Sequence, residues 1–442
     1  MTTATQPALD QESLAHPKRT LHVLDLPYDI LYLIITFTWI DPGQEFPVVL
    51  SHVCRLWRQY ALDTPGFWAS LTFKNSIPEI EKYQTWLERS KDSPFDLKIG
   101  SKPFTGASIK HAKAILRLIF PHVQRLRSLQ VNNIPLKIMQ VIFDRLNDVH
   151  LPSLETLHVE WVWSIIIDRR TVNRKFKPFR HGDAANLKHV TLRWASYDYV
   201  VHRFRNLETL DIVIQCSRNS SRGKAKTVQN ILSLLPDLRI LRILIEQGSW
   251  PEPRSGITVL PPLTHSSLEA LHLGASQDEV DTIVCALILP SLRRLCGRFE
   301  NDAYISTFCL PTLGLARPYP NLLHLQLYAP RAYGEPGSVV GLRDMEFFER
   351  ALGGLPQLQS LTLSGINLEN NKHLICLTRT CPQLKKLVFR SCSGPAVKEV
   401  RAMIQNRRDP KGMGSNSLEY LQIDDSAVNV QDLRVGLSAG SA

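Results

Sequence analysis

Polar side chains that could bind a partner recur at alternating positions of short apolar segments from about residue 154 onward. This alternation is typical of a strand whose apolar residues face a core and whose polar residues face the opposite side. Arginine and lysine donate charge-assisted hydrogen bonds to carboxylates and phosphates, and arginine and tyrosine are common in protein-binding hot spots. These segments therefore predict a target-binding surface on strands, which favours an acidic or phosphorylated protein. The predicted target-binding residues are His158, Arg193, Asp211, Arg242, His272, Arg298, His324, Tyr328, Lys386 and Arg390. The alternative is a solvated inner face, with binding at the rim or the C-terminal loops.

Motifs that assemble a catalytic site are missing from the sequence. It contains no G-x-S-x-G, no P-loop, no G-x-G-x-x-G and no H-E-x-x-H. The eight cysteines include no C-x-x-C pair, which fits reduced and mostly buried thiols. The sequence thus predicts a protein without catalytic residues, cofactor or metal.

A short sequence motif, which we call the phrase, recurs along the chain and predicts the strands that position these side chains. An apolar residue is followed by two others, a second apolar residue, one other and a third apolar residue. Such a phrase at intervals of roughly 20 to 30 residues is typical of a leucine-rich repeat. The copies start at Leu126, Leu154, Leu187, Leu207, Leu238, Leu268, Leu292, Leu322, Leu358, Leu384 and Leu418.

The phrase predicts a stacked α/β fold. Its last two apolar positions alternate along a strand and point inward, so each unit buries them only against its neighbours. Several of the segments between copies have helical spacing, at residues 227–235, 344–355 and 373–380. We expect a right-handed, irregular α/β solenoid with a parallel sheet on its concave side. Gly297 occupies the third apolar place of its copy, which predicts a bulge or altered curvature there.

The N-terminal residues predict two short helices that are too apolar for their size. Leu26 and Pro27 precede an uncharged stretch over residues 30–40, and a second helical pattern leads to Trp57. Proline is well suited to the first turn of a helix. A unit of about 45 residues buries too little surface to be stable alone, so these helices need a partner.

These residues resemble the F-box, and in particular the F-box proteins numerous in mushroom-forming fungi. The matching positions are Leu26, Pro27, Ile30, Leu31, Ser51, Val53, Cys54, Trp57 and Trp68. The resemblance implies a helical hook that inserts into the Skp-type adaptor of a cullin-RING ubiquitin ligase. Asp29 stands where the family often has Glu, a mild change at a helix start. The alternative is a helical cap on the following domain.

The residues expected to bind this adaptor are the apolar ones that the small module cannot bury alone. They are Leu26, Pro27, Ile30, Leu31, Leu50, Val53 and Trp57.

The chain is predicted to divide into five parts. They are a disordered N-terminal arm over 1–20, the F-box over 21–73, a packed helical connector with a possible first strand over 74–125, the leucine-rich-repeat domain over 126–425 and a C-terminal tail over 426–442. The longest uncharged apolar run is half of what a bilayer needs, so no membrane partner is expected.

A formal net charge of +11 makes acidic proteins and nucleic acid candidate partners. The excess concentrates in residues 169–180 and 218–226, which lack apolar periodicity and are interpreted as basic loops. Nucleic acid is not expected as a partner, because neither stretch interleaves aromatic residues.

The sequence predicts the α/β, non-catalytic substrate receptor of an SCF-type ubiquitin ligase, in the cytoplasm or nucleus. The F-box would bind the Skp-type adaptor and cullin, and the repeats would bind the target protein. The alternative is a leucine-rich-repeat scaffold or transcriptional regulator that acts without a ligase.

Overall fold

The structure, a computed structural model, describes most of the chain between residues 26 and 424. The described residues are 26–38, 45–74, 78–100, 108–161, 179, 184–192, 197–215, 221–246, 260–275, 277–299, 304–305, 319–328, 340–342, 352–367, 377, 380–392, 400, 403 and 418–424. The predicted arm, the predicted tail and almost all of the predicted basic loop at 169–180 lie outside them.

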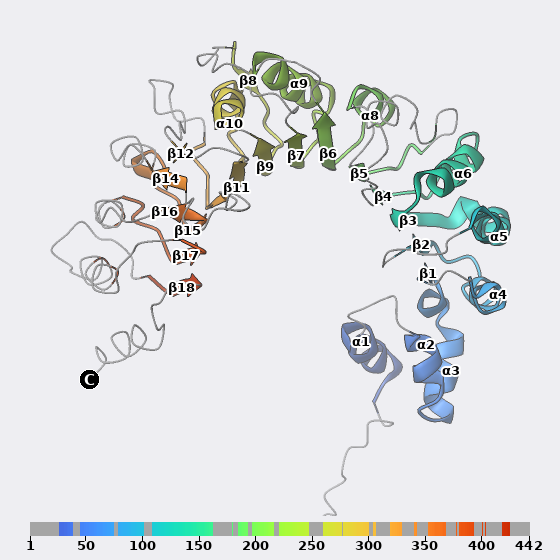
Figure 1. The fold of residues 1–442 in the computed structure, drawn as a ribbon. Helices are drawn as coiled ribbons and strands as arrows, with labels where there is room; N and C mark the ends of the chain where they lie inside the picture. Colours follow the sequence, from blue (N-terminus) through green and yellow to red (C-terminus); the bar gives the residue numbers. More distant parts are fainter. Residues whose placement is uncertain are drawn as a thin grey trace, which may run out of the picture.

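One sheet of 13 strands organises the molecule, and each strand pairs in parallel with its neighbours. In spatial order the strands are β1 (Ser70–Phe73), β2 (Phe95–Ile99), β3 (Leu126–Ile134), β4 (Thr156–Trp161), β5 (His189–Leu192), β6 (Thr209–Gln215), β7 (Ile240–Glu246), β9 (Ala270–Ala275), β11 (Arg294–Phe299), β13 (His324–Tyr328), β15 (Ser360–Ser364), β17 (Lys386–Arg390) and β18 (Tyr420–Asp424). The strands line the inner side of an open arc (Figure 1).

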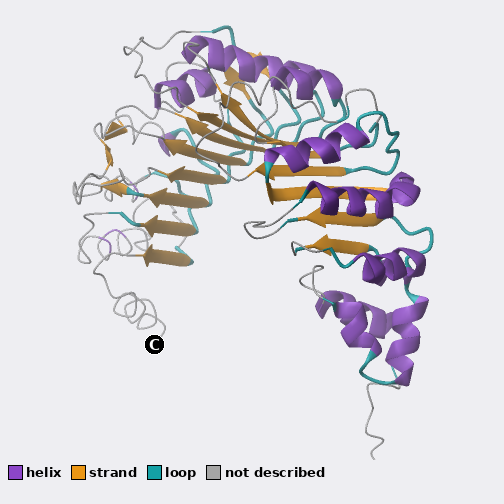
Figure 2. Cartoon of the chain, turned by 45° about the vertical axis from the view of Figure 1, so that its right-hand side comes forward, coloured by secondary structure: helices purple, strands orange, loops and turns teal. Residues whose placement is uncertain are grey.

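The connecting segments place helices and two small sheets on the outer side of the arc (Figure 2). The helices are α4 (Ile80–Arg89), α5 (Ile109–Ile119), η3 (Phe120–Arg125), α6 (Leu136–Leu146), α8 (Tyr197–Arg203), α9 (Ser221–Leu234) and α10 (Gln277–Cys285). The small sheets pair β8 (Leu263–Thr264) with β10 (Leu287–Ile288), and β12 (Tyr304–Ile305) with β14 (Val340–Leu342) and β16 (Ile366–Asn367).

The leucine-rich-repeat solenoid predicted from the phrase is confirmed. Leu241 and Ile243 of β7 are buried at the second and third apolar places, whereas Arg242 between them is only half-buried. Every phrase from Leu126 to Leu384 starts with a buried leucine, and only Leu418 in the last copy is partly buried. The apolar side chains thus form a continuous core between sheet and helices.

The sheet begins earlier than predicted. Its first strand starts at Ser70, inside the range given to the F-box, and the range 74–125 holds β2, α4 and α5. Because β2 pairs with both β1 and β3, these residues belong to the solenoid and are not a separate connector. The strand expected at Phe95–Ile99 is β2.

The repeat that contains β2 does not match the phrase, for a physical reason. Phe95 pairs with Leu126, as the first apolar residue of a phrase would, but Leu97 follows it after one residue where the phrase has two. The pairing of β2 with β3 therefore shifts register just after Phe95. Arg127, the extra residue on β3, extends back to Asp96 and donates two hydrogen bonds to its carboxylate, at 3.0 and 2.7 Å.

The bulge predicted at Gly297 is wrong. Pairing with β9 and with β13 runs through Gly297 without a register shift. A Cβ at this position would lie 3.4 Å from the ring of Phe299, which is itself buried. The phenylalanine ring therefore occupies the space near the missing leucine, and the strand stays regular.

The basic stretch at 218–226 is also not simply a loop, because its residues from Ser221 onward form the first turns of α9. The Lys224 side chain is buried and pairs with the Glu279 carboxylate of α10. Ala225 beside it is buried too. The helix predicted at 227–235 is confirmed as the later part of α9, whereas most of 344–355 and 373–380 lies outside the described residues.

The second residue of each phrase forms a line along the edge where the strands begin. The backbone N–H at this position donates to the carbonyl of the equivalent residue one repeat earlier, as Arg239 does to Glu208 and Glu269 does to Arg239, at 2.9 and 2.8 Å. The side chains in this line alternate in sign over seven repeats. We call this line the charge ladder, and its residues are Arg127, Glu155, Lys188, Glu208, Arg239, Glu269, Arg293, Leu323, Gln359, Lys385 and Glu419.

Ion pairs join neighbouring rungs of the charge ladder. The Arg239 guanidinium lies 2.7 Å from the Glu269 carboxylate, and Lys188 lies 3.6 Å from Glu208. At the far end of the sheet, Lys385 lies 3.2 Å from Glu419. The alternation stops at Leu323, which carries no charge.

A helical module closes the N-terminal end of the arc (Figure 1). It consists of α1 (Tyr28–Thr38), α2 (Phe46–Ser51), α3 (Arg55–Asp63) and η2 (Pro65–Trp68). Trp68 is fully buried, donates its indole N–H to the Ala61 carbonyl at 2.6 Å and packs edge-on against Trp86 of α4 at 5.7 Å. The module therefore shares a core with the solenoid.

Candidate interaction surfaces

Helix α1 carries apolar residues on two faces. Leu31 and Ile35 are buried, at 1% and 3% exposed. Ile30, Leu33, Ile34 and Phe37 are exposed, at 44%, 48%, 42% and 81%. Their spacing of i, i+3, i+4 and i+7 is that of a continuous apolar face on a helix. We call these four residues the α1 stripe.

The predicted adaptor-binding residues divide between core and surface. Ile30 and Val53 are exposed, as is Pro27, whereas Leu26 is partly buried. Leu31 and Leu50 were predicted to bind an adaptor, but they are buried in the module and cannot contact a partner without unfolding it. Helical spacing identified the apolar residues, but not which of two apolar faces turns inward.

Trp57 is partly buried and packs against the same core, so it too is mainly structural. Its indole nitrogen is buried and has no hydrogen-bond partner among the described residues. Cys54 explains the local pattern: its sulfur accepts a hydrogen bond from the Trp57 N–H and caps α3. The Val-Cys-Arg-Leu-Trp sequence therefore starts a helix and leaves Val53 exposed before it.

The concave face presents three rows of side chains that run across the strands. The row nearest the strand starts holds Ser128, Thr156, His189, Thr209, Ile240, Ala270, Arg294, His324, Ser360, Lys386 and Tyr420. The middle row holds Lys98, Gln130, His158, Thr191, Asp211, Arg242, His272, Cys296, Gln326, Thr362, Val388 and Gln422. The third row, from β7 to β17, holds Leu244, Gly274, Arg298, Tyr328, Ser364 and Arg390.

Most of the predicted target-binding residues take places in these rows. The middle row brings Asp211, Arg242 and His272 together on consecutive strands, with His158 two strands before Asp211. The other rows divide the rest: the first contains His324 and Lys386, and the third contains Arg298, Tyr328 and Arg390. Arg193 lies outside the described residues.

Two cations of the concave rows were missed from the sequence, Lys98 on β2 and Arg294 on β11. Arg294 is exposed on β11 in the first row, next to His324 on β13. It is the third residue of its phrase, directly before an inward leucine, and this position was available as a signal.

The electrostatic environment of the concave face is positive around its histidines. Burial and the nearby cations Arg242 and Arg294 lower the pKa of His272 to about 4, so its ring is neutral near pH 7. Burial also lowers the pKa of His324, and the nearby cations Arg294 and Lys386 lower it further. Burial raises the pKa of the Cys296 thiol to about 11, so this cysteine is a neutral part of the surface.

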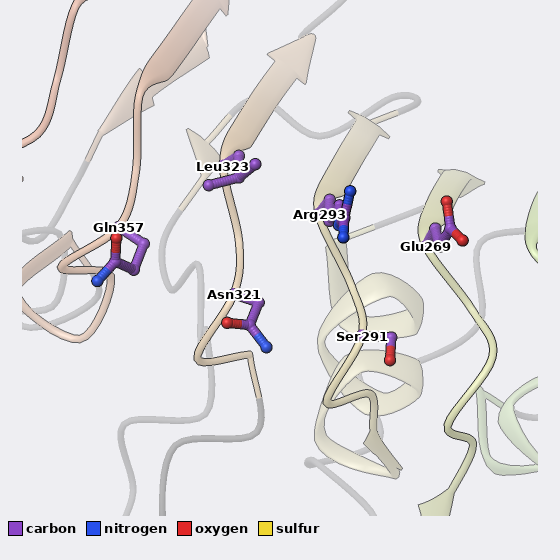
Figure 3. A pocket seen from close by; sticks show the side chains of 6 residues that line it. All are labelled: Glu269, Ser291, Arg293, Asn321, Leu323 and Gln357. Atoms are coloured by element: carbon purple, nitrogen blue, oxygen red, sulfur yellow. The ribbon is translucent and has the colours of Figure 1, made fainter.

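A pocket of about 380 Å³ lies where the charge ladder loses its alternation (Figure 3). It is lined by Glu269, Ser291, Arg293, Asn321, Leu323 and Gln357. These residues stand before successive strands, so the pocket opens at the edge of the sheet and not on the concave rows (Figure 3). The Asn321 amide donates to the Pro290 carbonyl at 2.8 Å, which fixes one wall.

Within the described part of the chain, no group of three or more histidine, cysteine or acidic side chains is placed to bind a metal. Likewise, none of the described helices has the length and apolar composition needed to cross a bilayer.

Comparison with known proteins gives structural similarity only. No family model and no curated protein matches the sequence. Among solved structures, the chain is similar to the leucine-rich repeat-containing protein LegL7 from Legionella pneumophila, with a TM-score of 0.35 and 11% identity over 85% of this chain and 98% of that one. It is also similar to a TLR13–ssRNA13 complex, with a TM-score of 0.29 and 13% identity over 78% of this chain and 54% of that one.

Proposed function

We propose that this chain is a non-catalytic interaction protein that holds a target on its concave sheet while its N-terminal helices bind an adaptor. More specifically, we propose the substrate receptor of an SCF-type ubiquitin ligase, with a Skp-type adaptor and cullin as partners, in the cytoplasm or nucleus. The proposal combines the F-box resemblance of residues 26–68 with the repeat solenoid that follows.

The α1 stripe is the observation that carries this proposal. A helix of 11 residues that exposes four large apolar side chains at i, i+3, i+4 and i+7 is poorly suited to remain in water. Val49 and Val53, at 63% and 56% exposed, add apolar surface on α2 and directly after it. An adaptor with an apolar groove would bury this surface, and buried apolar anchors supply most of the affinity of such interfaces.

The rest of the fold supports a receptor that works by proximity. The module and the sheet share one core through Trp68, so a target on the concave face would be held at a fixed position relative to the adaptor. A fixed geometry raises the effective concentration of a target lysine near a ubiquitin carrier. No catalytic group on this chain is needed for that effect.

The experiment is co-purification of the Skp-type adaptor and cullin with the tagged full chain. Ile34→Glu with Phe37→Glu places two charges in the α1 stripe without touching the buried Leu31 and Ile35. Loss of anchors worth about 2 kcal/mol or more predicts at least roughly thirtyfold weaker adaptor capture. Ile109→Glu is the matched control, because Ile109 is also 42% exposed but lies on α5.

Equal capture of the adaptor by wild type and by the Ile34→Glu, Phe37→Glu variant, with both folded, would refute the proposal. The runner-up function is a leucine-rich-repeat scaffold or transcriptional regulator that acts without a ligase. Recovery of other partners by wild type, with neither adaptor nor cullin among them, would favour this second function.

A further inference from the structure

Two strands of the concave face carry matching pairs of cations. On β11, Arg294 lies in the first row and Arg298 in the third. On β17, Lys386 lies in the first row and Arg390 in the third. All four side chains are exposed. We call these four residues the basic frame.

The dimensions of the basic frame follow from sheet geometry. Residues i and i+4 of a strand are about 13 Å apart, which is the separation within each pair. Two strands, β13 and β15, lie between β11 and β17, so the pairs are three strand spacings or about 14 Å apart. The backbone positions of the four cations therefore mark the corners of a nearly square area.

The floor inside the basic frame is uncharged and polar near pH 7. Its residues, on β13 and β15, are His324, Gln326, Tyr328, Ser360, Thr362 and Ser364. No acidic residue occupies any of the three rows on the strands from β9 to β17. Burial is the largest cause of the lowered pKa of His324 on the floor, and the cations Arg294 and Lys386 lower this pKa further. Cations on both sides of the floor therefore act on the enclosed area.

We propose that the basic frame binds an extended, acidic polypeptide segment whose Asp or Glu residues are spaced four apart. This inference rests on the proposed function, because it names the kind of target that the concave face would hold. In an extended chain, residues i and i+4 lie on the same face and are about 13 Å apart, which matches the frame along the strands and nearly matches it across them. Carboxylates at these places can pair with the corner cations, while small polar residues between them contact the floor.

An acidic polypeptide fits the basic frame better than a single-stranded nucleic acid does. Sequence-tolerant nucleic-acid binding uses several aromatic side chains on which successive bases stack. Besides the imidazole of His324, the floor has a single ring, that of Tyr328, and its remaining residues donate and accept hydrogen bonds.

The test measures binding of labelled twelve-residue peptides to the purified full chain by fluorescence anisotropy. One peptide carries three glutamates at every fourth position in a serine and glycine background, and a second carries the same three glutamates in a row. We expect the spaced peptide to bind about tenfold more tightly, with an affinity that falls as salt is raised. Equal affinity of the two peptides would overturn the proposed spacing.

Arg294→Glu with Arg298→Glu should weaken binding of the spaced peptide by about tenfold or more. Lys110→Glu with Lys113→Glu is the matched control, since both lysines are exposed on α5 and the change in net charge is the same. Equal weakening in both variants would reduce the effect to net charge and overturn the site. If the charge reversal impairs folding, Arg294→Gln with Arg298→Gln gives the same comparison, and it should also weaken binding.

A ten-nucleotide single-stranded RNA completes the experiment. Tighter binding of RNA than of the spaced peptide, lost in the Arg294→Glu, Arg298→Glu variant, would assign the frame to nucleic acid and overturn the proposal. Adaptor capture by the same variants should equal that of wild type. If wild type binds the spaced peptide but captures no adaptor, the ligase role fails while the basic frame stands.

Discussion

At the scale of single residues, Lys224 carries a charge that is buried in the described structure. Its side chain is 9% exposed and that of its partner Glu279 is 4% exposed, so both charges have left water. A buried pair of this kind adds little net stability over apolar residues, but removal of one partner leaves a buried charge without its counter-ion. The basic composition around Lys224 predicted a solvated loop, because composition alone does not reveal a buried acidic residue 55 positions later.

The first prediction follows from this pair. Lys224→Met should lower the free energy of unfolding by about 3–5 kcal/mol, and adding Glu279→Leu should restore much of it. Equilibrium urea unfolding measures both changes. Lys226→Met, on the exposed side of the same helix, should change stability by less than about 0.5 kcal/mol. Similar costs at residues 224 and 226 would contradict the structural role of the ion pair.

The second prediction concerns pH and His272. Its pKa is about 4 in the folded protein and 6.5 in the absence of burial and of the cations Arg242 and Arg294. Between pH 6.5 and 4 the unfolded chain therefore binds the proton more tightly, so the free energy of unfolding falls as pH decreases. His272→Gln should show a shallower fall over this range in urea unfolding curves at stepped pH. Superimposable curves for variant and wild type would show that His272 does not contribute.

At the scale of elements, strand register was the most predictable property of this molecule. The phrase repeats an inward leucine at fixed places, and β-strand alternation then assigns the neighbours to the concave side. Where the spacing changed by one residue, at Phe95, the phrase did not include β2 among the repeats, although alternation predicted a strand there. The rows across strands follow from the phrase as well, because the residue at a given place of one phrase pairs with the residue at the same place of the next.

The third prediction tests this register at two strands. Leu241 is fully buried, so Leu241→Ala should lower the free energy of unfolding by about 2–5 kcal/mol, through lost burial and the cavity left behind. Gln326 faces the concave side and is partly exposed, so Gln326→Ala should change stability by less than about 0.5 kcal/mol. Chemical denaturation of both variants provides the comparison. Equal sensitivity at the two positions would mean that the strand faces are reversed.

At the scale of the whole molecule, the helical module and the solenoid share one core, which Trp68 joins. The sequence predicted both parts, but it separated them by a connector that the structure incorporates into the sheet. The α1 stripe could have been found from its spacing. The choice of the exposed face required knowing which side of α1 packs on Phe67. In the structure, the ring of Tyr32 stacks on the ring of Phe67, with 5.9 Å between the ring centroids.

The fourth prediction is that Trp68→Ala loosens the module from the solenoid. Loss of this buried ring and its contact with Trp86 should cost about 3–5 kcal/mol. Amide hydrogen exchange should then accelerate in residues 46–63 more than in the strands from β7 to β17. Uniform acceleration across the chain would instead indicate one cooperative unit in which Trp68 has no special position.

The charge ladder also bears on how a gene for this protein can change. Repeat proteins grow and shrink when recombination duplicates or deletes units. Between Arg127 and Arg293, a change of one unit would place two like charges on adjacent rungs, whereas a change of two units would preserve the alternation. Related chains of different length should therefore differ in this region by even numbers of repeats, with single-unit changes confined to the stretch around the neutral residues Leu323 and Gln359.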